Sequence, residues 1–177
     1  YIMIHLSSPK TLGNEKIYIE ECLESGWLST SGPFIEKFEE ELSKYVNSKH
    51  VVACINGTSA LHISLKLLDV EAGDEVIVPT ITFISTINSI IYNNASPIFM
   101  DCDDFYNLDT VKTIEFIKSE TYFKSGYTYN KKTNKRIPAI VPVHVWGNAL
   151  WLDELYDLCQ ERNIKILEDA SESLGTT

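Results

Sequence analysis

The feature that most constrains the fold of this chain is the alternation of short β-branched runs with longer segments of helical period. This alternation is typical of βαβ units, in which each crossover helix packs against a largely parallel sheet. The predicted strands are 51–55, 75–78, 97–100, 139–143 and 164–167, and the predicted helices between them are 59–68, 84–92, 110–118 and 152–162. Five strands and four helices predict a doubly wound α/β fold with three layers, α/β/α.

Two further helices are predicted ahead of the first strand, at 13–25 and 33–46. Ser31 is a suitable cap for the second of them, and Pro33 suits its first turn. The loop between the helices contains Trp27, flanked by polar residues and glycine. A tryptophan in such a loop serves a binding site or packs on its own domain, and the sequence leaves both interpretations open.

The composition limits the classes of partner. A chain of 177 residues with 44% hydrophobic content has the length of one ordinary domain and can bury one substantial core. The formal charge of −10 argues against a general attraction to nucleic acid or to anionic membranes. The basic run Lys131–Arg136 contains turn residues, so we predict that it is the solvated tip of a β-hairpin within 121–137.

Neither a membrane segment nor a metal site is indicated. No apolar run approaches the roughly 20 residues needed to span a bilayer, and the first residues lack the pattern of a secretory signal, so a cytoplasmic protein is expected. The four cysteines have no C-x-x-C spacing and indicate neither a zinc site nor a disulfide framework.

Four chemically rich stretches directly follow predicted strands. Because ligands of open α/β sheets bind beyond the carboxyl ends of the strands, these stretches are the first candidates for a site. They are Asn56-Gly57-Thr58-Ser59, Pro79-Thr80-Ile81-Thr82-Phe83, His144-Val145-Trp146-Gly147-Asn148 and Glu168-Asp169-Ala170-Ser171-Glu172.

The first of these turns offers backbone N–H donors and hydroxyls at a helix N-terminus. The helix macrodipole favours negative charge there, so a phosphate is a natural occupant. The same residues also suit an ordinary helix start capped by Thr58 or Ser59, and taken alone this is the simpler interpretation.

The last turn places Glu168 and Asp169 at the ligand edge of the sheet. A buried carboxylate is costly without a cationic partner, and a protonated heterocyclic nitrogen is such a partner. Phe83 could supply a flat face for a planar ring, although plain core packing is the common role of phenylalanine. A phosphate turn, an aromatic face and a strand-end acid together match the needs of pyridoxal 5'-phosphate.

Several of these stretches resemble the DegT-type sugar-nucleotide aminotransferases. The likeness runs from about residue 4 to 177 and is strongest in Asn56–Leu61, Gly73–Pro79, Pro142–His144, Glu168–Glu172 and the loop Gly26–Pro33. It implies the type I pyridoxal-phosphate fold, pyridoxal 5'-phosphate as the cofactor, and a homodimer in which active sites lie between two subunits.

The resemblance also implies roles for individual residues. Thr58 and Ser59, with Gly57, would bind the cofactor phosphate, largely through backbone N–H groups. Phe83 would stack on the cofactor ring, and Asp169 would pair with the pyridinium nitrogen and keep it protonated.

Glu172 and His144 depart from this simple assignment. Glu172 stands where many family members carry glutamine near the phenolic oxygen of the cofactor, so we expect it to be protonated or turned away. Unchanged cofactor affinity and spectrum in Glu172→Gln would argue against a special role. His144 lines the pocket or makes a structural hydrogen bond, and the second role is favoured.

The resemblance implies a glutamate-dependent amination of a nucleotide sugar at its C4 ketone. The motif Met100–Asp103 and the inserted segment Tyr122–Arg136 look most like the branch that aminates UDP-4-keto-6-deoxy-HexNAc sugars for legionaminic-acid-type surface glycans. A sibling group in the family has histidine at the position of the Schiff-base lysine and performs a dehydration, and this alternative stays open. So does a non-catalytic nucleotide-binding α/β module, although G-x-G-x-x-G and P-loop motifs are missing.

The Schiff-base lysine of the family follows the Asp169 region by a short stretch. None of Lys10, Lys66, Lys118 or Lys165 stands in that context. We therefore expect residues 1–177 to be the N-terminal part of the large cofactor-binding domain, without the catalytic lysine and the small C-terminal domain. Such a chain by itself would bind the cofactor weakly and would not turn over.

Overall fold

A computed structural model describes residues 8–176 and divides the chain into two compact units, one ending at Ala53 and one beginning at Cys54. The second unit is built on a four-stranded parallel sheet in the order β2-β1-β5-β6. The strands are β1 (Glu75–Pro79), β2 (Ser96–Met100), β5 (Ala139–Ile140) and β6 (Lys165–Ile166). Ile77 of β1 pairs with Ile98 on one side and with Ile140 on the other. The predicted α/β fold with a parallel sheet is confirmed.

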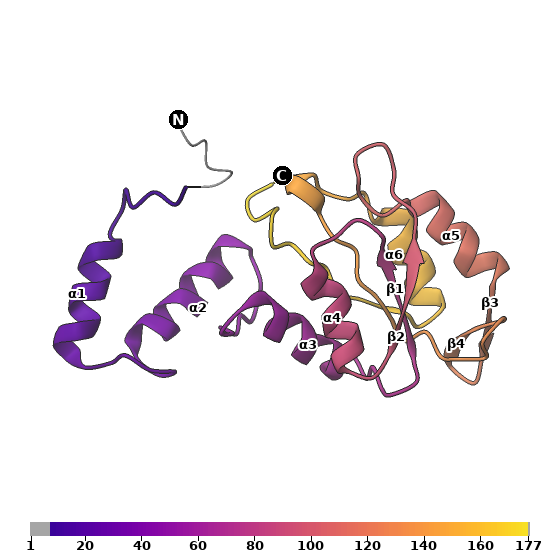
Figure 1. Cartoon of the computed structure of the whole chain (residues 1–177), viewed down its shortest axis with the longest axis horizontal. Helices are drawn as coiled ribbons and strands as arrows, with labels where there is room; N and C mark the ends of the chain where they lie inside the picture. Colours follow the sequence, from indigo (N-terminus) through magenta and orange to yellow (C-terminus); the bar gives the residue numbers. More distant parts are fainter. Residues whose placement is uncertain (1–7, 177) are drawn as a thin grey trace, which may run out of the picture. The chain divides into compact units, whose positions relative to one another are not determined.

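Helices cover both faces of this sheet, α4 on one side and α5 and α6 on the other (Figure 1). The helices of the second unit are α3 (Gly57–Leu67), α4 (Ile84–Tyr92), α5 (Thr110–Ser119) and α6 (Asp153–Glu161). Side chains alternate along β1, so Val76 and Val78 pack with α3 and α4 while Ile77 packs with α5 and α6. Within residues 8–176, no helix is long and apolar enough to cross a membrane.

The prediction of a strand at 51–55 was wrong. Residues 51–54 have no regular secondary structure, and the side chains of Val52 and Ile55 are exposed. A β-branched run becomes a strand only where a neighbouring strand completes its hydrogen bonds. Here the Ala53 N–H donates instead to a carboxylate oxygen of Glu39, at 2.7 Å.

The strands β5 and β6 are shorter than their predicted counterparts because the ladder becomes irregular at Pro142, which has no N–H to donate. The two segments nevertheless stay side by side: the Asp169 N–H donates to the Pro142 carbonyl (2.9 Å), and the His144 N–H donates to the Asp169 carbonyl (3.2 Å). An isolated parallel bridge joins Val143 and Asp169. The ends of both segments therefore reach the same edge of the sheet.

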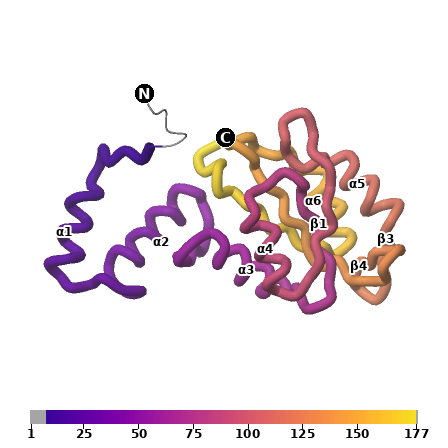
Figure 2. The backbone as a smooth tube through the Cα atoms, viewed as in Figure 1, coloured from indigo at the N-terminus to yellow at the C-terminus, as the bar shows by residue number. Residues whose placement is uncertain are grey.

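The predicted β-hairpin is present, but its tip is not at the basic run. Strands β3 (Thr121–Lys124) and β4 (Tyr127–Asn130) are antiparallel and are joined by Ser125 and Gly126. Both linking residues have positive φ, 52° and 85°, as a tight two-residue turn requires. The basic run begins directly after β4, which is labelled on the backbone trace in Figure 2.

The first unit contains α1 (Glu15–Ser25) and α2 (Pro33–Tyr45). Pro33 opens α2 as predicted, but Gly32 precedes it at the cap position with φ 138°, so the expected Ser31 cap is wrong. A Cβ atom at Gly32 would lie 3.2 Å from the Cβ of Trp27, which shows that the tryptophan packs on this loop.

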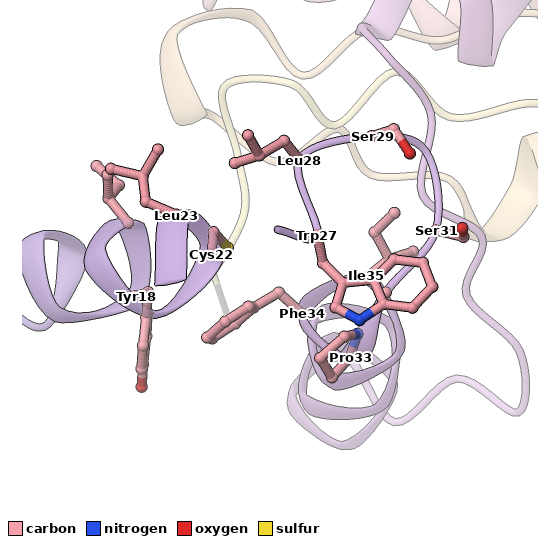
Figure 3. A pocket seen from close by; sticks show the side chains of 12 residues that line it. Tyr18, Cys22, Leu23, Trp27, Leu28, Ser29, Ser31, Pro33, Phe34 and Ile35 are labelled. Carbon is pink, nitrogen blue, oxygen red and sulfur yellow. The ribbon is translucent and has the colours of Figure 1, made fainter. Parts of the chain in front are cut away.

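An apolar groove of about 520 Å³ lies between α1 and α2. Figure 3 shows Phe34 pointing from α2 toward α1. The rings of Phe34 and Tyr18 are 5.2 Å apart between centroids, and Trp27 and Leu28 line the same groove.

Arg136, the last residue of the basic run, holds the hairpin segment to the sheet. Its guanidinium donates to both carboxylate oxygens of Asp74, from Nε at 3.0 Å and from Nη2 at 2.6 Å. The hydrogen bonds to Asp74 raise the pKa of Arg136. Beside this pair, the buried Glu75 accepts from Asn130 (2.8 Å) and Thr133 (3.0 Å).

We expect Arg136→Ala to lower the free energy of unfolding by about 3 kcal/mol, because removing one partner of a largely buried ion pair leaves the Asp74 carboxylate without a cation. Urea titration of the purified protein measures this. Lys132→Ala changes an exposed residue of the same basic run and is the control. It should change stability by no more than about 0.5 kcal/mol. A loss for Arg136→Ala no larger than that of the control would contradict the assigned role.

Candidate functional site

The carboxylate of Asp169 is the centre of the site. Asp169 follows β6 and is buried, with 6% of its surface exposed. Its Oδ1 accepts from the Ser171 hydroxyl at 2.5 Å and from the Ser171 N–H at 3.2 Å. Its Oδ2 accepts from the Thr86 hydroxyl at 2.8 Å. Three donors compensate part of the cost of removing a carboxylate from water.

Thr86 reaches Asp169 from α4, the helix that follows β1. It lies in the first turn of that helix and is completely buried. Thr82, four residues earlier, places its hydroxyl oxygen 3.0 Å from that of Thr86. The loop after β1 and the loop after β6 are thus connected by side-chain hydrogen bonds.

A pocket of about 350 Å³ opens beside Asp169. It is lined by residues from three of the four predicted loops, among them Thr82, Phe83, His144, Trp146, Asp169 and Glu172. Phe83 is 76% exposed, so its ring is available to a ligand and is not part of the core. The core-packing interpretation of Phe83 is therefore wrong for this structure.

The turn at Gly57 lies against this cluster, although it does not line the pocket itself. A Cβ atom built on Gly57 would be 3.9 Å from the Ser171 hydroxyl oxygen. The helix α3 begins at Gly57, two residues earlier than predicted, and its cap is Asn56 instead of Thr58 or Ser59. The Asn56 side chain accepts from the Ser59 N–H at 2.8 Å.

This cap limits which N–H groups can reach an anion. The helical ladder begins with the bond from the Ala60 N–H to the Asn56 carbonyl, at 3.1 Å. The N–H groups of Gly57 and Thr58 precede that ladder, whereas the N–H of Ser59 is occupied by the cap. An anion at this helix end would therefore be held by the first two N–H groups and by the hydroxyls.

His144 makes structural hydrogen bonds and also lines the pocket. Its Nδ1 accepts from the Leu150 N–H at 3.0 Å, so that nitrogen carries no proton. The proton is then on Nε2, which lies 3.0 Å from Oε2 of Glu168 and donates to it. This hydrogen bond from His144 lowers the pKa of Glu168.

A left-handed turn at Trp146 and Gly147 forms one wall of the pocket. Their φ values are 54° and 83°. A Cβ atom at Gly147 would lie 3.2 Å from the Glu172 carbonyl oxygen, which leaves little room for a side chain. The Trp146 N–H donates to the Glu172 carboxylate at 2.7 Å, so Glu172 is directed at this turn. The buried Asn107 supports the turn by accepting from the Val145 N–H at 3.0 Å.

The structure brings Phe83, Asp169 and Glu172 to one pocket and places Gly57, Thr58 and Ser59 in the adjoining helix start. Thr82, Thr86 and Ser171 were not assigned roles from the sequence. The spacing of Thr82 and Thr86, four residues apart at a helix start, could have predicted that these two threonines lie close to each other. Nothing in the sequence pattern indicated that Thr86 contacts Asp169, because that contact joins residues 83 positions apart.

The chain matches the DegT/DnrJ/EryC1/StrS aminotransferase family over residues 10–177. It belongs to this family. Among curated relatives, GDP-perosamine synthase of Vibrio cholerae is 35% identical over 174 residues, which cover 98% of this chain and 43% of that protein. The chain thus spans less than half the length of this relative.

Solved structures agree with the assignment to this family. A DegT/DnrJ/EryC1/StrS aminotransferase from Brucella abortus superposes with a TM-score of 0.80 at 29% identity, over 90% of this chain and 40% of that one. The GDP-4-keto-6-deoxy-D-mannose-3-dehydratase of Escherichia coli, solved with bound hydrated pyridoxal phosphate, gives 0.80 at 26% identity, over 97% and 42%. The fold prediction, a partial domain of a pyridoxal-phosphate enzyme, is confirmed.

The residues of the site fit pyridoxal phosphate. The phosphate of this cofactor needs a turn rich in N–H groups, and its aromatic ring needs an exposed flat face. Its protonated ring nitrogen needs a buried hydrogen-bond acceptor. The DegT-family site offers these in the turn at Gly57, in Phe83 and in Asp169. The pocket volume of about 350 Å³ is in the range of small-ligand sites.

The Glu168–His144 pair predicts a dependence of stability on pH. The ordinary pKa of 4.5 is lowered in the folded protein, so the pair stabilises the fold above about pH 4.5 and loses this contribution as the pH falls through the lowered pKa. We expect Glu168→Gln to be less stable than the native protein at pH 7, with the difference shrinking toward about pH 3. Urea titrations across this range measure it.

Glu161→Gln removes an exposed carboxylate from the end of α6 and serves as the control, with no comparable change across the range. If the difference between Glu168→Gln and the native protein were the same at every pH, the hydrogen bond from His144 to the ionised Glu168 carboxylate would not be its cause.

Proposed function

We propose that the protein is a pyridoxal-phosphate-dependent aminotransferase that transfers an amino group from glutamate to the C4 ketone of a nucleotide-linked 4-keto-6-deoxy sugar. The observation that carries this proposal is the buried Asp169 carboxylate, which is held by three donors at the wall of a pocket. A negative charge buried there, with Phe83 exposed beside it, suits a flat ring that carries a positive nitrogen. Membership of the aminotransferase family supports the reaction.

Each residue of the site has a proposed part. Asp169 accepts a hydrogen bond from the ring nitrogen and favours its protonated form. Phe83 packs against the ring face. The N–H groups of Gly57 and Thr58, with the hydroxyls of Thr58 and Ser59, hold the phosphate at the start of α3.

Glu172 is proposed to stabilise the pocket wall at Trp146 and not to contact the cofactor. Its carboxylate already accepts from the Trp146 N–H, so it supports the left-handed turn and does not approach the phenolic oxygen of the cofactor. This arrangement avoids contact between two negatively charged oxygens, which would repel each other.

The cofactor, when bound, supplies the electron sink for removing and adding the amino group. The described residues contribute binding, orientation and partial exclusion of water. The proton transfers of an amination require a base near the reacting carbon. We propose that this base is a lysine beyond Thr177, because no lysine is among the described residues that line the pocket.

The proposal also concerns the nucleotide that the sugar substrate carries. The sequence resemblance favours a UDP-linked 4-keto-6-deoxy-HexNAc sugar of a legionaminic-acid-like pathway. The names of GDP-perosamine synthase and of the GDP-4-keto-6-deoxy-D-mannose dehydratase refer instead to GDP-linked sugars. Both kinds of substrate therefore belong in an assay.

Dehydration of a 4-keto sugar is the second candidate, favoured by the similarity to the Escherichia coli dehydratase. The two reactions differ in the group that follows Asp169 in the chain, lysine or histidine, and in their products. An amination consumes glutamate and gives an amino sugar, whereas a dehydration loses water and gives no amino sugar.

We further propose that residues 1–177 are the N-terminal part of the large cofactor-binding domain and that the encoded protein is a cytoplasmic homodimer with shared active sites. The coverage of 43% of the Vibrio relative supports a longer encoded protein, and the apolar groove in the first unit supports a contact with a second subunit. Light scattering of the protein as its gene encodes it is expected to give twice the monomer mass. A monomer that still turns over would contradict shared sites.

The aminotransferase proposal predicts that the encoded protein, with pyridoxal phosphate, glutamate and a UDP- or GDP-linked 4-keto-6-deoxy sugar, forms 2-oxoglutarate and the 4-amino sugar in equal amounts. Asp169→Asn should lower the rate by on the order of 100-fold or more, because the preorganised negative charge at the ring nitrogen is lost. Mass spectrometry of the sugar and a coupled assay for 2-oxoglutarate measure both products.

Asp157→Asn, an exposed aspartate of α6, is the control and should leave the rate unchanged. A dehydrated sugar without an amino group would favour the second candidate. No reaction of glutamate or of either sugar with the cofactor-loaded protein would overturn the enzyme proposal.

A further inference from the structure

The hydrogen bonds of Asp169 leave one part of its carboxylate open. An ionised carboxylate has about four acceptor positions, two on each oxygen. Oδ1 already accepts two bonds, from the N–H and the hydroxyl of Ser171. Oδ2 accepts one bond, from Thr86. The remaining acceptor position is therefore on Oδ2, the oxygen held by α4.

The direction of the hydroxyl chain follows from the carboxylate. Because an ionised carboxylate only accepts, the Thr86 hydroxyl must donate to Oδ2, and its oxygen is left to accept from the Thr82 hydroxyl 3.0 Å away. The Thr86 hydroxyl then has one orientation, while the Thr82 hydroxyl has the Thr86 oxygen at 3.0 Å and the Phe83 carbonyl at 3.4 Å as acceptors. Thr86 is fully buried, so water does not compete for its proton.

Thr86 and Ser171 restrain the carboxylate in different ways. Ser171 is two residues from Asp169, so its bonds shape the turn but do not fix the turn relative to the rest of the fold. Thr86 is 83 residues away in sequence and belongs to α4. Its bond fixes the rotation of the Asp169 side chain relative to the helix that begins directly after Phe83.

We infer that Thr86 is a positioning residue for the cofactor: supported by Thr82, it holds the Asp169 carboxylate so that Oδ2 faces the ring nitrogen of pyridoxal phosphate, with Phe83 against the ring. This inference rests on the proposed function. Neither threonine needs to contact the cofactor ring for this role, since both act through Asp169.

The test is a binding comparison that does not depend on turnover. Pyridoxamine phosphate and its 1-deaza analogue, in which C–H replaces the ring nitrogen, are titrated into the encoded protein by calorimetry. The native protein is expected to bind pyridoxamine phosphate more tightly than the analogue. Thr86→Val keeps the shape of the side chain and removes the donor, so it should reduce this ratio of dissociation constants by about 10-fold.

Three variants make the result specific. Thr86→Ser restores a hydroxyl and should recover most of the ratio. Thr82→Val, at a half-buried position, should reduce the ratio by a smaller factor and covers the case in which Thr86→Val does not fold. Ser89→Ala is the matched control, because Ser89 is buried on the same helix but its hydroxyl donates to the Thr86 carbonyl at 2.7 Å.

The outcomes separate the two proposals. If the native protein binds neither ligand, the proposed function and this inference are both overturned. If the native protein discriminates between the ligands and Thr86→Val discriminates equally well, the positioning role is wrong while the proposed function stands. If Thr86→Val weakens both ligands by the same factor, Thr86 shapes the pocket and does not act through the Asp169 carboxylate.

Discussion

The parallel hydrogen-bonding of the central sheet determines where the loops that form the site lie in the second unit. Because β2, β1, β5 and β6 run in the same direction, the residues that follow each of them emerge at one edge. Phe83 after β1, His144 after β5 and Asp169 after β6 reach a common pocket for this reason. Even where Pro142 interrupts the regular pairing, the bond from the Asp169 N–H to the Pro142 carbonyl keeps the two loops in register.

A buried charge sets the second constraint. Asp169 is 6% exposed, and a carboxylate in that environment is tolerated only when donors replace its water. Ser171 and Thr86 supply those donors from two different elements. The same bonds that stabilise the carboxylate also orient it, so a requirement of folding produces a preorganised acceptor in a pocket.

The turn at Trp146 and Gly147 shows how an unusual backbone is supported. Trp146 and Gly147 adopt left-handed conformations, which are unfavourable for a bulky residue such as tryptophan. Hydrogen bonds from the Trp146 N–H to Glu172 and from the Val145 N–H to Asn107 offset this cost. The exposed indole, edge-on to Tyr106 at 4.9 Å between ring centroids, is held at the pocket as a result.

The sequence by itself determined the α/β class, the bounds of α4, the presence of the hairpin and the residues of the pocket wall, because these depend on local periodicity and on the direction of parallel strands. Only the tertiary structure decided that 51–55 is not a strand, since a strand needs a neighbour. It also decided the burial of Arg136 against Asp74 and the contact of Thr86 with Asp169. These contacts join residues more than 60 positions apart, and side-chain hydrogen bonds over such separations leave no periodic signal in a single sequence.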